Sequence, residues 1–525
     1  MVRVFLLLHT HIPYVKGYGR WPHGEEWLFE ALLYSYIPLF EGLLSLEKEG
    51  WQGKVLMSFT PVLLHMLGDE ALMRDFLEFI REMERRAEED ERVFSARKSE
   101  EFARLAHIWR SWFERRRRFF EEVGGGSILL LARRLAERGI IEPLASAATH
   151  AYLPLLSRDE TVADQVRIGF QQAEKVFGER PSGFWLPECG YRPSGWWENP
   201  VSGEIVWRRG IDEFLAGEST RYTFMDPSVL TSGEAGRKGY GLETALRGEG
   251  EGASIPAGVF GNQIVLFRDV PLGQQVWSRH LGYPGDEWYL EFHKKHEGSG
   301  IRYWRVTDSR GDLGSKLPYV PEKGEGMALA HSSHFLSRLL ERGRGNFLIA
   351  FDTELFGHWW FEGPLFLSNL LKKSMREGGR VSFVSPATLE KEQLPELEEL
   401  NEGSWGEGGG HGTWLNEKTR NIWKALYEAE GVYYGRVAKV RGNSPLLEEV
   451  KGLAWRELHL MASSDWTFLI TTGQGRDYGW ERFWGHYENF CYLTEIMDDI
   501  IKHRTIDGRK LAKINEIKRR DEIFR

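Results

Sequence analysis

Short apolar runs recur along this chain, and polar or aromatic residues follow each of them. Six such runs are Val4–Leu8, Val55–Phe59, Phe184–Leu186, Ile264–Phe267, Phe347–Phe351 and Val381–Val384. Short runs that are apolar throughout are typical of strands buried on both faces, as in a parallel sheet. Helical patterns lie between several of the runs. This alternation predicts an α/β fold with a parallel barrel, whose functional residues follow the carboxyl ends of the strands.

Three segments do not fit a bare barrel. Residues 69–125 are highly charged with apolar positions at helical spacing, which predicts a helical hairpin inserted into the barrel. Residues 231–252 are rich in glycine and lack apolar periodicity, which predicts a long mobile loop. After residue 400 a glycine-rich stretch leads into helical patterns. We therefore expect a barrel domain over residues 1–400 and an α-helical domain over residues 401–525.

The bulk composition excludes some classes of protein. The 525 residues carry a net charge of −9, which argues against nucleic-acid binding because such proteins present a basic face. No stretch approaches the ~20 apolar residues of a membrane span, and the first apolar run is too short for a signal peptide. We therefore expect a cytoplasmic protein. The only two cysteines, Cys189 and Cys491, predict no disulfide framework and no thiolate metal site.

Two carboxylates follow apolar runs and lie among aromatic residues, glycine and proline. Glu188 belongs to the segment 184–193, FWLPECGYRP, and Asp352 to the segment 351–364, FDTELFGHWWFEGP. Flat aromatic rings stack on pyranose faces, while one carboxylate attacks the anomeric carbon and the other transfers a proton. Together they predict a sugar-cleaving site. Glu354 lies two positions after Asp352, and we expect it to anchor the backbone or an arginine.

Two histidines at the end of the first run allow two interpretations. His9 and His11 resemble the His-x-His metal site of amidohydrolases, and His150 and His358 are further candidate ligands. No HExxH motif, cysteine ligand or clustered Asp-His set accompanies them. We therefore favour hydrogen bonding to sugar hydroxyls and to the carboxylates, with no metal. Sensitivity of the activity to a chelator separates the two interpretations.

A glycine-rich segment later in the chain frames two further rings. Residues 404–410, SWGEGGG, contain Trp405, and Trp414 follows shortly after. A domain linker with core tryptophans is the alternative interpretation. The chain holds 21 tryptophans, more than core packing alone requires, which favours carbohydrate stacking at some of them.

Five ordered segments resemble the signatures of glycoside hydrolase family 57 along essentially the whole chain. They are His9–Tyr14, Ala148–Pro154, Trp185–Pro193, Phe351–Pro364 and Ser404–Trp414. Within that family the chain is most similar to the 1,4-α-glucan branching enzymes. The features that point there are the helical insertion, the glycine-rich loop with Tyr240, the segments 275–278 and 282–285, and Ser463–Trp466.

The resemblance implies a distorted (β/α)7 barrel and a retaining mechanism. Glu188 would be the nucleophile, and Asp352 the general acid and then the general base. The loop with Tyr240 would close over the site and exclude water. Positions that match the family's glucan contacts are Arg268, Gly285, Trp405, Asp465 and Gln474, and those expected to line the cleft are His9, His11, His150, Trp277 and Trp414. The implied ligand is an α-glucan, and no cofactor is expected.

Other functions stay open from sequence alone. An α-amylase or a 4-α-glucanotransferase of the same family would use the same two carboxylates. A catalytically silent glucan-binding protein would not need them, so loss of activity in Glu188→Gln would exclude that alternative. Two departures from the family pattern, Thr10 between the histidines and Ala350-Phe351 before Asp352, leave the catalytic groups intact but alter the pocket wall.

Overall fold

The structure is a computed structural model that describes residues 1–20, 22–230, 256–278, 282–441, 444–503 and 506–524. The glycine-rich segment 231–252, and with it Tyr240, lies outside these residues. Among the described residues, no helix is both long enough and apolar enough to cross a membrane.

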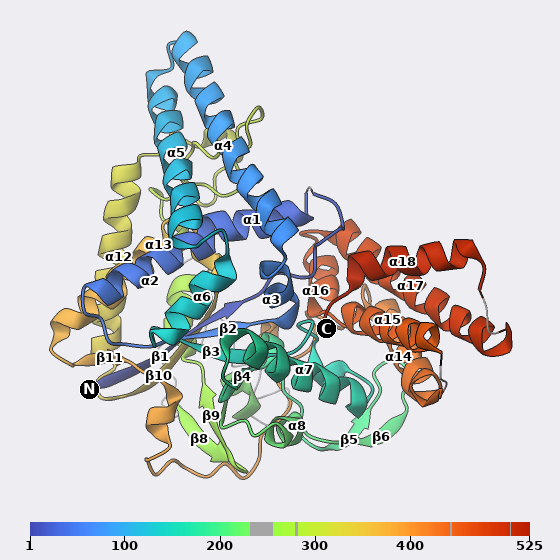
Figure 1. The fold of residues 1–525 in the computed structure, drawn as a ribbon. Coiled ribbons are helices and arrows are strands. Elements are labelled where there is room, and N and C mark those ends of the chain that lie inside the picture. Colours follow the sequence, from blue (N-terminus) through green and yellow to red (C-terminus); the bar gives the residue numbers. More distant parts are fainter. Residues whose placement is uncertain (21, 231–255, 279–281, 442–443, 504–505, 525) are drawn as a thin grey trace.

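A parallel sheet of seven strands forms the centre of the molecule (Figure 1). In spatial order the strands are β10 (Gly345–Asp352), β1 (Val2–Thr10), β2 (Val55–Phe59), β3 (Ile141–Ser146), β4 (Gly183–Trp185), β7 (Tyr222–Met225) and β9 (Gln263–Phe267). Two shorter strands extend it: β8 (Ala257–Phe260) is antiparallel to β9, and β11 (Val381–Phe383) is parallel to the start of β1.

The ends of this sheet approach each other without a continuous ladder. One parallel bridge joins Arg268, just after β9, to Leu348 in β10, and the Asp269 amide donates to the Leu348 carbonyl at 2.7 Å. The sheet is therefore a curved, incompletely closed ring of seven parallel strands. The predicted α/β class with a distorted (β/α)7 barrel is confirmed.

Both faces of the strands are buried, which explains why the runs are apolar throughout. In β1, Phe5 and Leu7 pack with Leu56 and Leu348 in a cluster of their own, while the alternating Leu6 packs in the largest core cluster. Successive side chains of a strand point to opposite faces. One set therefore fills the interior of the ring and the other packs beneath the surrounding helices.

The helices outside the ring follow the strands in sequence. They are α1 (Glu25–Ala31), α2 (Ile37–Lys48), α3 (Pro61–Leu67), α6 (Ile128–Glu137), α7 (Asp159–Phe177), α8 (Ile211–Gly217), α11 (Val270–Trp277), α12 (Pro321–Glu341) and α13 (Gly363–Ser374). A separate antiparallel hairpin, β5 (Gly195–Glu198) with β6 (Ile205–Arg208), leaves the ring after β4.

A helical hairpin projects from the barrel at the top of Figure 1. It consists of α4 (Glu70–Ala96) and α5 (Glu100–Arg118). The Asp69 carboxylate caps α4 by accepting from the Leu72 amide at 2.9 Å, which satisfies one of the free N–H groups of the first turn. Phe76 of α4 and Phe113 of α5 are buried, so each helix turns an apolar stripe towards the core.

Five helices pack beside the barrel at the right of Figure 1. They are α14 (Arg420–Gly435), α15 (Pro445–Met461), α16 (Ser464–Thr472), α17 (Arg476–His503) and α18 (Gly508–Asp521). They share one hydrophobic core with the flank of the barrel, where Val166 of α7 and Leu453 of α15 belong to the same cluster. The start of α16 reaches the barrel because the Ser464 amide donates to the His150 carbonyl at 3.0 Å.

Candidate active site

Glu188 lies in a strained turn at the carboxyl end of β4. Its φ of 61° and ψ of 20° are left-handed, a conformation that costs a residue other than glycine about 1–3 kcal/mol. Contacts from two other segments hold it there. The Trp405 indole donates to Glu188 Oε2 at 2.7 Å, and the Ser464 hydroxyl donates to Oε1 at 3.2 Å. Such strain is typical of a functional site, and here it directs the carboxylate into a cavity.

Asp352 is the last residue of β10 and is the register partner of His9 in β1. The adjacent carboxyl ends of two parallel strands therefore bring an imidazole and a carboxyl group to the same edge of the sheet. Glu354 follows in the next turn, where its Oε1 accepts from the His11 amide at 3.1 Å and from the Tyr36 hydroxyl. Glu354 therefore anchors the backbone at His11, as expected. Its side-chain partner is Tyr36 and not an arginine.

One cavity of about 390 Å³ contains both predicted catalytic carboxylates. Nine of the predicted catalytic and substrate-binding residues line it: His9, His11, His150, Glu188, Arg268, Trp277, Asp352, Trp405 and Asp465. They come from β1, β10, α11 and α16, from the segments after β1, β3, β4 and β9, and from the glycine-rich segment 404–410. The structure therefore brings together residues that are spread over more than 450 positions of the chain.

Three predicted residues lie elsewhere. Gln474 lines an adjoining cavity of about 410 Å³, which shares Trp27 and Trp359 with the first. Gly285 lies in the short turn Tyr283–Gly285 that follows α11, outside the residues lining either cavity.

Trp414 differs most from its expected position in the wall of the cleft. Its ring stacks on Tyr152 at 4.1 Å, and its side chain is buried in the core shared by the barrel and the helices. Its carbonyl accepts from the Trp423 indole at 2.9 Å. The structure corrects the expected placement: Trp414 lies in the core between the barrel and the C-terminal helices, where burial of a large indole stabilises the fold.

The two carboxyl groups differ in their electrostatic surroundings. Desolvation raises the pKa of Glu188 to about 7, although the hydrogen bond from Trp405 opposes the shift. The pKa of Asp352 lies well above its usual value, because the group is desolvated and faces the negative charges of Glu354 and Glu188. Hydrogen bonds from Trp405 and Ser464 offset part of the shift at Glu188, so Glu188 ionises near pH 7, whereas Asp352 is held in its protonated form. This division matches a nucleophile and a general acid.

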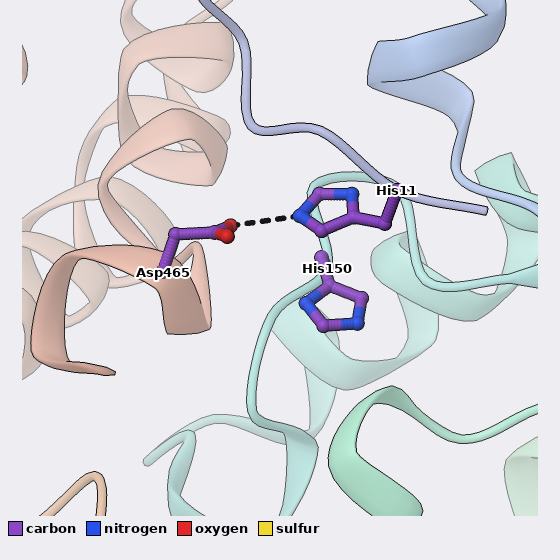
Figure 2. A group of neighbouring side chains, drawn as sticks. All are labelled: His11, His150 and Asp465. Carbon is purple, nitrogen blue, oxygen red and sulfur yellow. Dashed lines mark hydrogen bonds and ion pairs between the residues drawn. The ribbon is translucent and has the colours of Figure 1, made fainter. Parts of the chain in front are cut away.

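His11 and His150 stack between β1 and α16 (Figure 2), and His9 lies beside His150. The rings of His11 and His150 lie 4.0 Å apart with 19° between their planes. His9 Nε2 lies 2.8 Å from His150 Nε2, and burial together with the neighbouring histidines holds the pKa of both His9 and His150 well below the usual value. Both rings are therefore neutral at pH 7.

Neutral rings define the direction of a hydrogen-bond chain that ends on Glu188. His150 Nδ1 lies 2.8 Å from the Ser464 hydroxyl, which itself donates to Glu188. Because the Ser464 hydroxyl donates its one hydrogen to Glu188, it accepts from His150 Nδ1–H. A neutral His150 then has no hydrogen on Nε2, so that nitrogen accepts from His9 Nε2–H. His9 Nδ1 then accepts from the Ser58 hydroxyl at 2.7 Å. The chain stabilises the ionised form of Glu188 without placing a second charge beside it.

Asp465 lies at the edge of the His11 ring (Figure 2). Its Oδ2 lies 2.9 Å from His11 Nε2 and also accepts from the Ser463 hydroxyl. Burial alone would raise the pKa of Asp465, but the charge and hydrogen bond of His11 outweigh it and hold the pKa at about 2. Asp465 is therefore a permanent anion at the edge of the cavity, and it has acceptor capacity left for a ligand hydroxyl.

His11, His150 and Asp465 are near enough to one another to be considered as metal ligands. Metal ligation requires ring lone pairs to converge on one point, but two rings stacked face to face direct theirs into separate parallel planes. The two nitrogens of His11 are also hydrogen-bonded, to Thr60 at 2.8 Å and to Asp465. The arrangement fits a hydrogen-bonding role and does not fit a metal without rotation of the rings.

A second such group, Glu457, His486 and Asp521, is buried between α15, α17 and α18. Arg482 bonds to His486 at 3.1 Å, and Arg520 bonds to Asp521 at 2.9 Å. Two guanidinium groups already compensate the negative charge, so this group is a structural network and does not fit a cation site.

Several residues of the cavity wall were not predicted from the sequence. Trp27, Trp359 and Phe468 add aromatic surface, and Gln274 adds an amide. Trp359 had a signal, because it lies in the same segment as Asp352. Trp27 lies in the first turn of α1, outside every sequence motif. Phe468 is one apolar residue among many in α16. Ser464, which bridges His150 and Glu188, adjoins Asp465 and was marked only as part of Ser463–Trp466.

Comparisons with known proteins identify the family of the chain. The profile of glycosyl hydrolase family 57 matches residues 5–400, and that of the 1,4-alpha-glucan branching enzyme C-terminal region matches residues 425–525. The chain is 38% identical to the 1,4-alpha-glucan branching enzyme TK1436 of Thermococcus kodakarensis, over 99% of this chain and 77% of that protein.

Two solved structures extend the comparison. A GH57-type branching enzyme from Pyrococcus horikoshii is 37% identical with a TM-score of 0.91, covering 100% of this chain and 95% of that chain. The α-amylase AmyC from Thermotoga maritima is 26% identical with a TM-score of 0.81, covering 100% and 97%. The family profile spans most of the sequence, and the overall fold agrees with both structures. The chain belongs to glycosyl hydrolase family 57.

Proposed function

We propose that this protein is a 1,4-α-glucan branching enzyme, which cleaves an α-1,4 link and re-forms it as an α-1,6 branch in a glycogen-like polymer. The observation that carries the proposal is the match of residues 425–525 to the branching-enzyme C-terminal region, because the helix α16 within it contributes Asp465 to the wall of the catalytic cavity and a hydrogen bond from Ser464 to Glu188. The barrel over residues 1–400 and the helices over residues 401–525 then act as two domains around one site.

The cavity supports a double displacement in which the configuration at the anomeric carbon is retained. Ionised Glu188 attacks the anomeric carbon of the donor glucan, and protonated Asp352 gives its proton to the leaving oxygen. The bond from the anomeric carbon to the leaving O4 breaks as the bond to Glu188 forms. Asp352, now ionised, takes the proton from a 6-hydroxyl of an acceptor glucan, whose oxygen displaces Glu188. No metal or cofactor takes part.

Aromatic rings around the two carboxylates suit the proposed substrate. Trp277, Trp405, Trp359 and Trp27 line the cavity, and the last two continue into the adjoining cavity that holds Gln474. Rings in this arrangement stack on successive pyranose faces, while Asp465 and Arg268 provide polar contacts to hydroxyls. The two joined cavities offer room for more than one sugar unit.

An α-amylase is the second candidate, because AmyC shares the fold over the whole chain. Proton NMR of the products from amylose, together with a reducing-end assay, separates the two. Branching gives new α-1,6 anomeric signals with little increase in reducing ends. Rising reducing ends without α-1,6 signals would show an amylase, and altered chain lengths with neither change would show a 4-α-glucanotransferase.

The location in the cell and the pathway are proposals of the same kind. Both cysteines are unpaired thiols in the structure, as expected in a reducing compartment, and we place the protein in the cytoplasm. Its product there would be a storage polysaccharide.

The pH profile of kcat/KM is expected to fall on its acidic side through the titration of Glu188. Below a pKa of about 7 Glu188 is protonated and cannot attack, whereas Asp352 keeps its proton because its own pKa is raised. Trp405→Phe removes a donor that favours the ionised form of Glu188, so its pKa rises further and the acidic limb moves to higher pH.

A matched variant tests this assignment. Trp277 lies in the same cavity, with its ring 6.4 Å from that of Trp405. Trp277→Phe is expected to lower activity without moving the acidic limb. An acidic limb that stays in place in Trp405→Phe would assign that limb to another group.

A further inference from the structure

The hairpin β5–β6 exposes an aromatic pair that is not part of the wall of the catalytic cavity. Trp196 and Trp207 are register partners on neighbouring strands, with exposed fractions of 73% and 58%. Their rings lie 5.6 Å apart at an angle of 86°. Glu198 and Ile205 lie on the same outer face, as the two-residue period of a strand requires. A contiguous exposed aromatic face of this kind is unusual on a monomer and indicates a binding surface.

The inner face of the hairpin holds it firmly to the molecule. Trp197 and Arg208 are buried, and the Arg208 guanidinium lies 5.2 Å from the Trp197 ring. Arg208 donates to Asp159 at 2.6 Å and to the Leu156 carbonyl at 2.7 Å, which ties the hairpin to the start of α7. The hairpin turn is fixed too, because the Asn199 side chain accepts from two backbone amides of its own loop. The outer rings are therefore presented on a rigid platform.

A cavity of about 740 Å³ adjoins the platform, and Trp207 lines it. Its other walls come from residues 157–160 at the start of α7 and from α14. Four basic and four acidic side chains line it, so their charges balance. Amide and hydroxyl groups from Asn199, Ser202 and Tyr427 line it as well. Balanced charge with many hydrogen-bonding groups fits a neutral, hydroxyl-rich ligand and argues against a phosphate or another strongly charged one.

Exposed tryptophans occur in few places on the described residues. Four are more than about a third exposed: Trp277 and Trp359 line the catalytic cavity, and Trp196 and Trp207 lie on the hairpin. The hairpin thus repeats the aromatic and polar chemistry of the catalytic cavity. Two rings inclined to each other suit a curved α-1,4-linked chain, whose successive pyranose faces are inclined as well. Trp196 follows Glu188 by eight residues, so at most roughly 29 Å of chain separates them.

We propose that the outer face of the β5–β6 hairpin, with the polar cavity beside Trp207, is a second binding site for α-glucan. The ligand class rests on the proposed function, but the site is separate from the catalytic cavity. A polymer held at the hairpin has a raised effective concentration at the catalytic cavity, which a short oligosaccharide would not experience. The site therefore favours long glucans over short ones.

The test compares binding in a background without turnover. In Glu188→Gln protein, native electrophoresis through gels containing amylopectin measures the dissociation constant from the retardation. The added substitutions Trp196→Ala and Trp207→Ala are expected to weaken binding roughly 10-fold, since aromatic contacts dominate such surfaces. Ile205→Ala is the matched control, because it removes an exposed apolar side chain from the same face without removing a ring.

Kinetics with otherwise unmodified protein provides the second measurement. Trp196→Ala/Trp207→Ala is expected to raise KM for amylopectin by a similar factor, with kcat and the activity on maltotriosyl fluoride unchanged. Equal retardation of the double variant and its parent would overturn the proposal. So would a parent that sediments as a dimer and a double variant that sediments as a monomer with unchanged binding, because the face would then join two copies of this chain.

The outcomes also separate this proposal from the proposed reaction. Retardation that depends on the two tryptophans, together with NMR that shows no α-1,6 signals, would keep the second site and reject the branching activity. Branching activity without any effect of the two tryptophans on binding or KM would keep the branching activity and reject the second site.

Discussion

Replacement of Glu188 by glutamine is expected to reduce the transfer activity by roughly 10⁴-fold or more, because a neutral amide cannot attack the anomeric carbon. The fold should survive, since glutamine keeps an acceptor for the Trp405 indole. Maltotriosyl fluoride makes the loss specific. Fluoride departs without a proton, so Asp352→Asn should still form the glycosyl-enzyme with this donor, and Glu188→Gln should not. Intact-protein mass spectrometry detects the covalent adduct in the first variant only.

Glu354 provides the matched control for this experiment. Its carboxyl group lines the same cavity, and burial raises its pKa to about 7 as it does for Glu188. Its hydrogen bonds with Tyr36 and the His11 amide assign it to backbone support. Glu354→Gln is expected to cost far less activity, roughly 10-fold. An adduct on Glu188→Gln, or a loss in Glu354→Gln as large as in Glu188→Gln, would refute the assignment of the nucleophile.

Gly357→Ala is expected to destabilise the protein by about 3 kcal/mol or more. Gly357 has φ of +114°, and a Cβ there would lie 1.8 Å from the carbonyl oxygen of Tyr34. The obstacle is backbone in a buried turn between α1 and α2, which cannot rotate away as a flexible side chain can. Because the segment carries Asp352 and Trp359, catalysis should fall as well. Denaturant unfolding measures the loss of stability.

Gly343→Ala separates the cost of the backbone conformation from the cost of the overlap with Tyr34. Gly343 also has a positive φ, +73°, but a Cβ there would meet nothing within 4 Å. Its substitution is expected to cost about 1–2 kcal/mol from backbone conformation alone. Similar losses in both variants would show that overlap with Tyr34 contributes little, contrary to the structure.

The strands most visible in the sequence were those buried on both faces. The run around β1 is apolar for both the interior of the ring and the outer helices, which leaves little ambiguity. β3 is harder to predict from the sequence because Glu142 and Pro143 interrupt its apolar run. β7 is only four residues long, and nothing local distinguishes such a strand from a loop. The hairpin β5–β6 did carry a turn signal, since Asn199-Pro200 and Gly203 lie between two short segments rich in tryptophan and β-branched residues.

The two candidate catalytic carboxylates could be singled out from the sequence because each follows a strand among rings and glycines. Their supporting contacts could not. The Ser464 hydroxyl bonds to Glu188, which lies 276 positions earlier in the chain. No local sequence pattern predicts a contact over that separation. Trp414 shows the converse, because a tryptophan in a glycine-rich segment looks the same in sequence whether it faces a ligand or Tyr152. Tyr240 lies outside the described residues, and its role as a lid remains a prediction.

The pairing of His11 with Asp465, 454 positions apart, has a consequence for how such enzymes can diversify. The barrel supplies the imidazole and the helical region supplies its counter-charge, so neither part holds a complete site. We expect an exchange of the helical region between homologues to preserve function only if the incoming helix presents a serine and an aspartate at the same positions. We therefore expect the contacts inside the cleft to limit recombination at the junction near residue 400, so that the two parts are inherited together.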